Sequence, residues 1–189
     1  MEFPSTTASS CSLTQQRVKP PANRRLGDVS SIEAGPEMNT LQVRLYRPQD
    51  FAALQTLDQQ CFPPGIAYAE EELRQFLSAR DAIVRVAHRE NEILGFIIAQ
   101  IYRGRPTFQA RIITIDVAPS HRRSGIGAIL MDACEQEMRR LLVTRVRLEV
   151  SVANISAQGF YSRYHYEEIG HIPEYYATGE DAFVLQKKL

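Results

Sequence analysis

The sequence is poor in the features that mark exported and disulfide-bonded proteins. Its 189 residues include three cysteines and no tryptophan. Cys11, Cys61 and Cys134 are too few and too scattered for a disulfide framework, and no Cys-x-x-Cys pair offers a zinc or redox site. The N-terminus also lacks the contiguous apolar segment of a signal peptide. We therefore expect reduced thiols and a cytoplasmic location.

No charge of one sign dominates, and long apolar runs are absent. Lys plus Arg and Asp plus Glu both total 22, so no global positive field is expected to attract nucleic acid or anionic membrane. The four histidines (His88, His121, His165 and His171) have no spacing that sets two metal ligands on one helical face. The longest apolar run, residues 93–101, is much shorter than the roughly 20 residues that span a bilayer. The composition therefore predicts a soluble protein without a bound metal.

The chain divides by composition into a short leader and one domain. Residues 1–40 are rich in Ser, Thr, Pro, Gly and charge, without helical or strand periodicity. Such a segment buries too little apolar surface to offset the entropy of ordering, so we predict a disordered leader. Residues 41–189 are long enough for one cored domain. Met38 stands just before the first patterned segment, and a native start at this methionine is a hypothesis.

Within residues 41–189 the hydrophobic pattern predicts seven strands and four helices. The strands are expected over residues 41–46, 82–88, 93–102, 110–117, 143–150, 167–172 and 182–186, and the helices over residues 51–60, 70–79, 125–141 and 155–164. The helix between the fourth and fifth strands acts as a crossover and makes these two strands parallel, whereas the others pair antiparallel.

A turn rich in arginine and glycine precedes the long helix. Free backbone N–H groups at a helix start carry partial positive charge, and Gly125 and Gly127 would let an anion approach them. Arg122 and Arg123 would add charge-assisted hydrogen bonds, which favours a phosphate-bearing ligand. A glycine-softened helix start with solvated arginines would account for the same residues, and neither the Walker pattern nor the third glycine of a dinucleotide fold is present.

Strand, short loop, R-x-x-G-x-G/A and amphipathic helix together resemble the acetyl-CoA signature of the GNAT acyltransferases. The resemblance runs from about residue 41 to the C-terminus and includes Glu149 to Ala157 followed by Phe160-Tyr161. It implies an α/β (α+β) fold with a mixed, mostly antiparallel sheet of about seven strands, flanked by helices and containing one splayed parallel pair. It also implies acetyl-CoA as cosubstrate, without a metal. The expected cofactor-binding residues are Ile115, Val117, Arg122, Arg123, Ser124, Gly125, Ile126, Gly127, Ala128, Asn154 and Tyr161.

The C-terminal segment from Pro173 to Ala182 resembles a subgroup of this family, the ribosomal-protein N-acetyltransferases and the catalytic subunits of N-terminal acetyltransferases. In this subgroup a tyrosine pair between the last two strands lines the peptide entrance. The resemblance therefore implies a substrate-binding role for Tyr175 and Tyr176, with an opposite wall that includes Phe62, Pro63 and Tyr68. By composition alone, that wall is a proline turn with buried aromatic rings.

One position departs from the family pattern. The family usually ends the helix after its catalytic tyrosine with Gly-Phe, where this chain has His165-Tyr166. A glycine at a helix end commonly adopts a positive φ. We therefore expect either strain at His165 in the left-handed region or a shifted turn at this helix end, with an effect on stability rather than on chemistry.

Acetyl transfer to an amine needs a proton acceptor, a proton donor for the thiolate and donors for the oxyanion. Glu149 is the candidate base, acting through water, because strand alternation places it on the more polar face; a cross-strand ion pair is its alternative role. Tyr161 is the candidate acid, although tyrosines often only fill cores. The amide of Val117 is the candidate oxyanion donor, given a nearby bulge, and Asn154 is expected to cap the following helix.

The sequence as a whole favours an N-acetyltransferase that moves acetyl from acetyl-CoA directly to an amine in a ternary complex. The favoured acceptor is the α-amine of a protein or peptide N-terminus, because it is neutral at pH 7 in roughly a tenth to a sixth of molecules, against under about a thousandth for lysine. Lysine or a small amine as acceptor, and a non-catalytic module that senses acyl-CoA, are the alternatives. The sequence indicates neither the acceptor's first residues nor an oligomeric state.

Overall fold

The computed structural model describes residues 40–103 and 107–189. The leader predicted over residues 1–40, Thr40 excepted, and the hypothetical start at Met38 lie outside this part. The described elements follow in the order β1 (Gln42–Leu45), α1 (Phe51–Cys61), α2 (Glu70–Ser78), β2 (Ala82–Arg89), β3 (Glu92–Arg103), β4 (Phe108–Val117), α3 (Ile126–Arg140), β5 (Val143–Ser151), α4 (Ile155–Arg163), β6 (Glu167–Ile172) and β7 (Ala182–Lys188). Short 3-10 turns, η1 (Pro48–Asp50) and η2 (Pro119–His121), precede α1 and α3, and the pattern had not indicated them.

The seven strands form one sheet in the order β1-β2-β3-β4-β5-β7-β6. Every neighbouring pair is antiparallel except β4 and β5, which are parallel because α3 connects them as a crossover. The mixed sheet confirms the predicted fold class, and each element differs from its predicted bounds by only a few residues.

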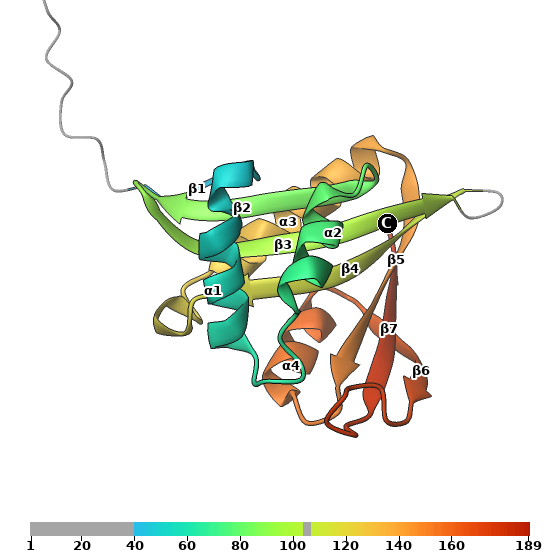
Figure 1. Cartoon of the computed structure of the whole chain (residues 1–189). Coiled ribbons are helices and arrows are strands. Elements are labelled where there is room, and N and C mark those ends of the chain that lie inside the picture. Colours follow the sequence, from blue (N-terminus) through green and yellow to red (C-terminus); the bar gives the residue numbers. More distant parts are fainter. Residues whose placement is uncertain (1–39, 104–106) are drawn as a thin grey trace, which may run out of the picture. The chain divides into compact units, whose positions relative to one another are not determined.

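Helices cover both faces of the sheet (Figure 1). Helices α1 and α2 lie on one face, where Leu54 and Leu73 pack with Phe96 and Ile98 of β3. On the other face the apolar stripe of α3 packs against β2 to β5, as its periodicity predicts. In the described part of the chain, every helix is too short or too polar to cross a bilayer.

The parallel pair separates soon after it forms. Residues Phe108–Arg111 of β4 pair with Val143–Arg147 of β5, and the ladder stops at Arg111. Beyond this point β4 continues along β3, and β5 continues along β7. A register shift places Ile113 as an extra residue in β4 opposite β3, which is the bulge expected near the end of this strand. The splay lies in the middle of the sheet, where the second halves of β4 and β5 diverge.

Candidate active site

The turn between β4 and α3 has the geometry of an anion site. Gly125 is the residue before α3, and its φ of +88° is one that residues with a Cβ atom rarely adopt. In the described part of the chain, no side chain caps this helix end, so the first backbone N–H groups of α3 can donate to a ligand. A Cβ at Gly127 would meet the Phe160 ring at 3.6 Å, so the glycine leaves room between α3 and α4.

The two arginines of this turn differ in orientation. Both are exposed, but the Arg122 guanidinium donates to the carbonyl oxygens of Val117, at 3.4 Å, and of Cys61, at 3.5 Å. Arg123 is exposed and has a φ of +62°. The side chain of Arg122 therefore connects the end of β4 to the end of α1, whereas Arg123 faces solvent.

Glu149 lies on β5, two residues beyond the last parallel pairing, and its side chain is 4% exposed. One carboxylate oxygen accepts from Arg111 Nε at 2.7 Å, and the other accepts from Arg147 at 2.9 Å. Both roles considered for this residue are thus compatible with the structure, since the cross-strand ion pair with Arg111 is present. Two guanidinium groups compensate the charge of a carboxylate that faces the α1 and α2 side of the sheet.

Tyr161 lies on α4 and is buried, 6% exposed. Burial raises the pKa of its hydroxyl well above the ordinary value, and the charge of Asp116 and the nearby Tyr176 add to this effect. The phenol is therefore protonated at neutral pH. Tyr176 is also within electrostatic reach of Glu149, so it links the surroundings of the candidate base and the candidate acid. Asn154 caps α4 as expected, accepting from Ala157 N–H at 3.0 Å.

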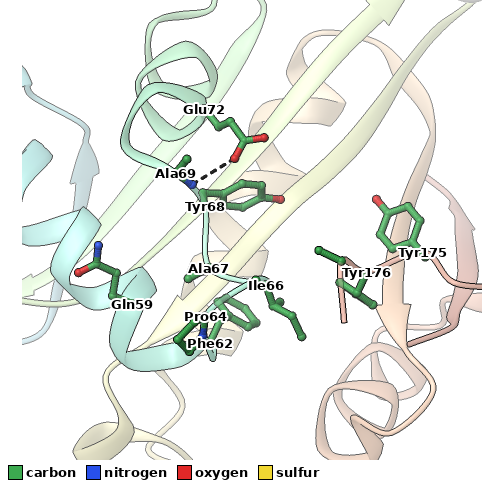
Figure 2. A pocket seen from close by; sticks show the side chains of 12 residues that line it. Gln59, Phe62, Pro64, Ile66, Ala67, Tyr68, Ala69, Glu72, Tyr175 and Tyr176 are labelled. Atoms are coloured by element: carbon green, nitrogen blue, oxygen red, sulfur yellow. Dashed lines mark hydrogen bonds between the residues drawn. The ribbon is translucent and has the colours of Figure 1, made fainter. Parts of the chain in front are cut away.

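A pocket of about 880 Å³ opens between two loops that are far apart in sequence (Figure 2). One wall comes from the end of α1 and the segment that leads to α2; the other comes from the loop between β6 and β7. The lining residues are Gln59, Phe62, Pro64, Gly65, Ile66, Ala67, Tyr68, Ala69, Glu72, Tyr175, Tyr176 and Ala177. Four of the five expected substrate-binding residues are therefore in the lining. The fifth, Pro63, shapes the turn instead, since its carbonyl accepts from Ile66 N–H and Ala67 N–H.

The tyrosine pair is held by contacts to the two splayed strands. Tyr175 and Tyr176 meet edge to face, with ring centroids 5.0 Å apart. Arg111 donates to the Tyr175 hydroxyl at 2.6 Å while it also binds Glu149. At the far end of the loop, Ser151 of β5 donates to Glu180. The β6–β7 loop is thus attached to the same strand that carries the candidate base.

A pair of acidic side chains lies beneath the pocket. Asp58 on α1 and Asp116 on β4 are each 1% exposed, and each keeps one buried carboxylate oxygen without a hydrogen-bond partner among the described residues. Burial raises the pKa of Asp58 to about 6, against bonds from Tyr68 N–H and from Asp116. Burial also raises the pKa of Asp116 to about 8, against a bond from the Thr114 hydroxyl. Because two contacting carboxylates repel, the pair holds one shared proton at neutral pH.

Sequence reasoning missed three residues of this site. Arg111 occupies a polar position of β4, and the sequence had indicated a role for this strand only in binding the cofactor and stabilising the oxyanion. Asp58 stands in the apolar stripe of the first helix, and Asp116 stands between Ile115 and Val117 in a buried strand. Acidic residues in apolar patterns are a signal of a paired or functional group. That signal could have identified the two aspartates, although it could not have paired them.

Comparison with known proteins agrees with this geometry. Residues 51–166 match the acetyltransferase (GNAT) family. An N-alpha-acetyltransferase of Sulfurisphaera tokodaii is 31% identical over 124 residues, which cover 61% of this chain and 74% of the relative. The crystal structure of Ard1 from Thermoplasma volcanium is 26% identical, with a TM-score of 0.73 over 79% of this chain and 97% of that one.

A third similarity concerns the fold alone. The crystal structure of Arabidopsis thaliana NAA60 in complex with acetyl-CoA is 20% identical, with a TM-score of 0.71 over 79% of this chain and 99% of that one. The family match spans more than half of the chain and includes α1, the turn before α3, and α4. The chain belongs to the acetyltransferase (GNAT) family, and it is an acetyltransferase.

Proposed function

We propose that this acetyltransferase moves the acetyl group of acetyl-CoA to the free α-amine of a protein or peptide N-terminus. The pocket between the α1–α2 segment and the tyrosine pair carries this proposal, because it lies on the face of the sheet toward which Glu149 points. The likeness to an N-alpha-acetyltransferase at 31% identity supports the choice of acceptor.

The cofactor would bind along the splay of β4 and β5. Its phosphates would be held by the uncapped first turn of α3, with Arg122 and Arg123 beside it. Its thioester would then lie near the end of β4, where the amide of Val117 is the proposed donor to the oxyanion. Ile115, Asn154 and the remaining residues of the turn are the proposed further contacts.

In the proposed reaction the amine nitrogen attacks the thioester carbonyl and the carbon–sulfur bond breaks. The proton of the amine passes through water toward Glu149, since both carboxylate oxygens already accept bonds from guanidinium groups. Tyr161 gives its proton to the departing sulfur and regains one from solvent. The Tyr161 phenol is protonated at neutral pH, as this role requires, while its raised pKa makes it a weaker acid than an exposed tyrosine.

The two cysteines in the described part of the chain, Cys61 and Cys134, are poor candidates for a covalent acetyl carrier. Burial raises the pKa of Cys134 to about 12, and burial also raises the pKa of Cys61. Both thiols are therefore un-ionised at neutral pH, and the Cys61 thiol donates to the carbonyl oxygen of Val117 instead of to a base. This supports direct transfer within a ternary complex.

A peptide panel tests the acceptor. Each short peptide would contain one internal lysine and would be offered in two forms, with a free and with a blocked N-terminus, while release of CoA is followed. We expect turnover of the free form and at least about a 100-fold lower rate with the blocked form, since lysine amines are rarely neutral. Equal rates would assign the enzyme to lysine, and silence on every amine, with CoA still bound, would favour the acyl-CoA sensor.

A further inference from the structure

The two buried carboxyl groups beneath the pocket have no part in the proposed chemistry. Asp58 Oδ1 and Asp116 Oδ2 have no hydrogen-bond donor from any other group in the described residues, and no ion pair of that part of the chain reaches either side chain. The two carboxyl groups are near enough to influence each other's pKa, so one proton held between these two oxygens would give both of them a partner. A buried acid that lacks a cation is costly, so this arrangement calls for a reason beyond packing.

Asp58 connects this pair to the wall of the pocket. Its second oxygen accepts from the backbone N–H of Tyr68 at 2.8 Å. Tyr68 lines the pocket, and its hydroxyl donates to the carbonyl of Ile113 in the bulge of β4 at 3.2 Å. The carboxyl pair and the tyrosine therefore join the same two elements, α1 and β4, from two sides. The position of Asp58 sets where the backbone of this wall lies.

A hydrogen bond between these two carboxyl groups requires a proton. If that proton is lost, two negative charges remain in contact at a site that water barely reaches, and they repel. The other titratable or charged groups that face the pair are Cys61, Tyr68, Arg122 and Tyr161. Of these, Arg122 alone is a cation, and its guanidinium donates to backbone carbonyls instead of either carboxylate. Nothing in this surrounding set replaces the lost proton.

We propose that Asp58 and Asp116 form a pair that positions the acceptor. While they share one proton, they hold Tyr68 and the α1–α2 wall in the shape that binds the peptide. Loss of the proton moves this wall. The inference rests on the proposed function in one respect, that the pocket receives the acceptor. It adds a property that the family fold does not require, since a pH-dependent affinity for the acceptor would follow from these two side chains.

The kinetic test compares wild type with Asp116→Asn, whose amide donates to Asp58 at every pH as the shared proton does. KM for a short peptide with a free N-terminus would be measured at about pH 6.5 and about pH 9, where the pair changes from protonated to ionised. Titration of the peptide amine affects both enzymes alike, so it cancels in the ratio of the two KM values. We expect the ratio of wild type to variant to rise at least about threefold between the two pH values, with KM for acetyl-CoA following no such trend.

Two further variants provide an independent test and a matched control for this comparison. Asp58→Asn keeps an oxygen for Tyr68 N–H and offers an amide to Asp116, so it should give the same trend by an independent route. Asp50→Asn is the matched control, because Asp50 is also buried and precedes the same helix but is paired with Arg44. Its KM ratio should not change with pH. A flat ratio for both test variants would overturn the proposal.

A spectroscopic measurement separates this inference from the proposed function. The infrared carbonyl band of a protonated carboxyl group should be present in wild type at about pH 6.5, decline toward about pH 9, and be missing from the difference spectrum of Asp116→Asn. This readout needs no acceptor. If the band declines with pH as expected but no peptide is acetylated, the proposed function is wrong and the protonated carboxyl pair is confirmed. If the band is absent, the positioning pair itself is refuted.

Discussion

The cofactor end and the acceptor end of the proposed site are built in different ways. The anion turn is a single stretch of seven residues, from Arg122 to Ala128, in which local backbone geometry supplies the donors. The acceptor pocket joins α1, the segment before α2 and the β6–β7 loop, and Arg111 of β4 connects its Tyr175 to Glu149 of β5. The cofactor end therefore depends on glycine and backbone, and the acceptor end depends on side-chain networks between distant segments.

The largest effect is expected at the acceptor end, from Glu149→Gln. Loss of the carboxylate removes the proton acceptor and leaves Arg111 and Arg147 without their shared partner. We expect turnover to fall by about 100-fold or more while the dissociation constant for CoA changes less than about twofold. Glu168→Gln, an exposed glutamate on β6, is the matched control and should keep full activity. A mutant that turns over normally would exclude Glu149 as the base.

A pH-dependent loss of stability is expected from the carboxyl pair alone. Because burial raises the folded-state pKa of Asp116 to about 8, the folded protein binds more protons than the unfolded chain between about pH 4 and about pH 8. The free energy of unfolding that this group contributes is complete at low pH and is lost as the pH rises through this window. The unfolding free energy of Asp116→Asn should therefore rise relative to that of wild type by about 2 kcal/mol between pH 5 and pH 8. One pKa unit corresponds to about 1.4 kcal/mol, and structural relaxation around the charged group reduces the full effect of the shift. Urea unfolding of both proteins across this range measures it.

The cofactor end should respond to backbone strain instead. Gly125→Ala places a Cβ on a residue with φ of +88°, which costs about 1–2 kcal/mol and displaces the first N–H groups of α3. We expect the dissociation constant for CoA to rise about tenfold, with KM for the peptide little changed. Gly159→Ala, inside α4 with no close neighbour for its Cβ, is the control and should leave CoA binding intact. Equal effects on cofactor and peptide would contradict the separation of the two ends.

The smallest effect is expected from Tyr175→Phe. This change removes one hydrogen bond, from Arg111, at the exposed rim of the pocket. We expect KM for the peptide to rise by about two- to fivefold, because an exposed bond of this kind contributes about 0.5–1 kcal/mol, the lower part of the usual range, with turnover at saturation unchanged. Tyr102→Phe on β3 serves as the control. A fall in turnover comparable to that of Glu149→Gln would mean that Arg111 positions the base only when the tyrosine holds it.

This contrast also explains what the sequence could predict. Strand alternation, the stripe of α3 and the glycines of its first turn are local patterns, and they yielded the seven strands, four helices and the parallel pair. The positive φ at His165, +62°, was likewise one of the two outcomes expected at this helix end, and it is the one that the structure shows.

The parts that sequence could not supply are long-range. Arg111 meets Tyr175 across 64 positions of the chain, and Asp58 meets Asp116 across two elements on one face of the sheet. No local pattern fixes such pairings, because they depend on how α1 packs on β4 and on the path of the β6–β7 loop. Family resemblance indicated the aromatic walls of the pocket but carried no information about these charged contacts.

The attachment of the β6–β7 loop has a practical consequence for engineering. Exchanging this loop with that of a relative is an obvious route to altered acceptor preference. Here the loop depends on Arg111 at one end and on Ser151 at the other, outside the exchanged segment. A grafted loop that does not preserve these two hydrogen bonds would not be attached to β4 and β5. The guanidinium of Arg111, which binds Glu149, would then lose its second partner. A successful transplant has to include residues of both central strands.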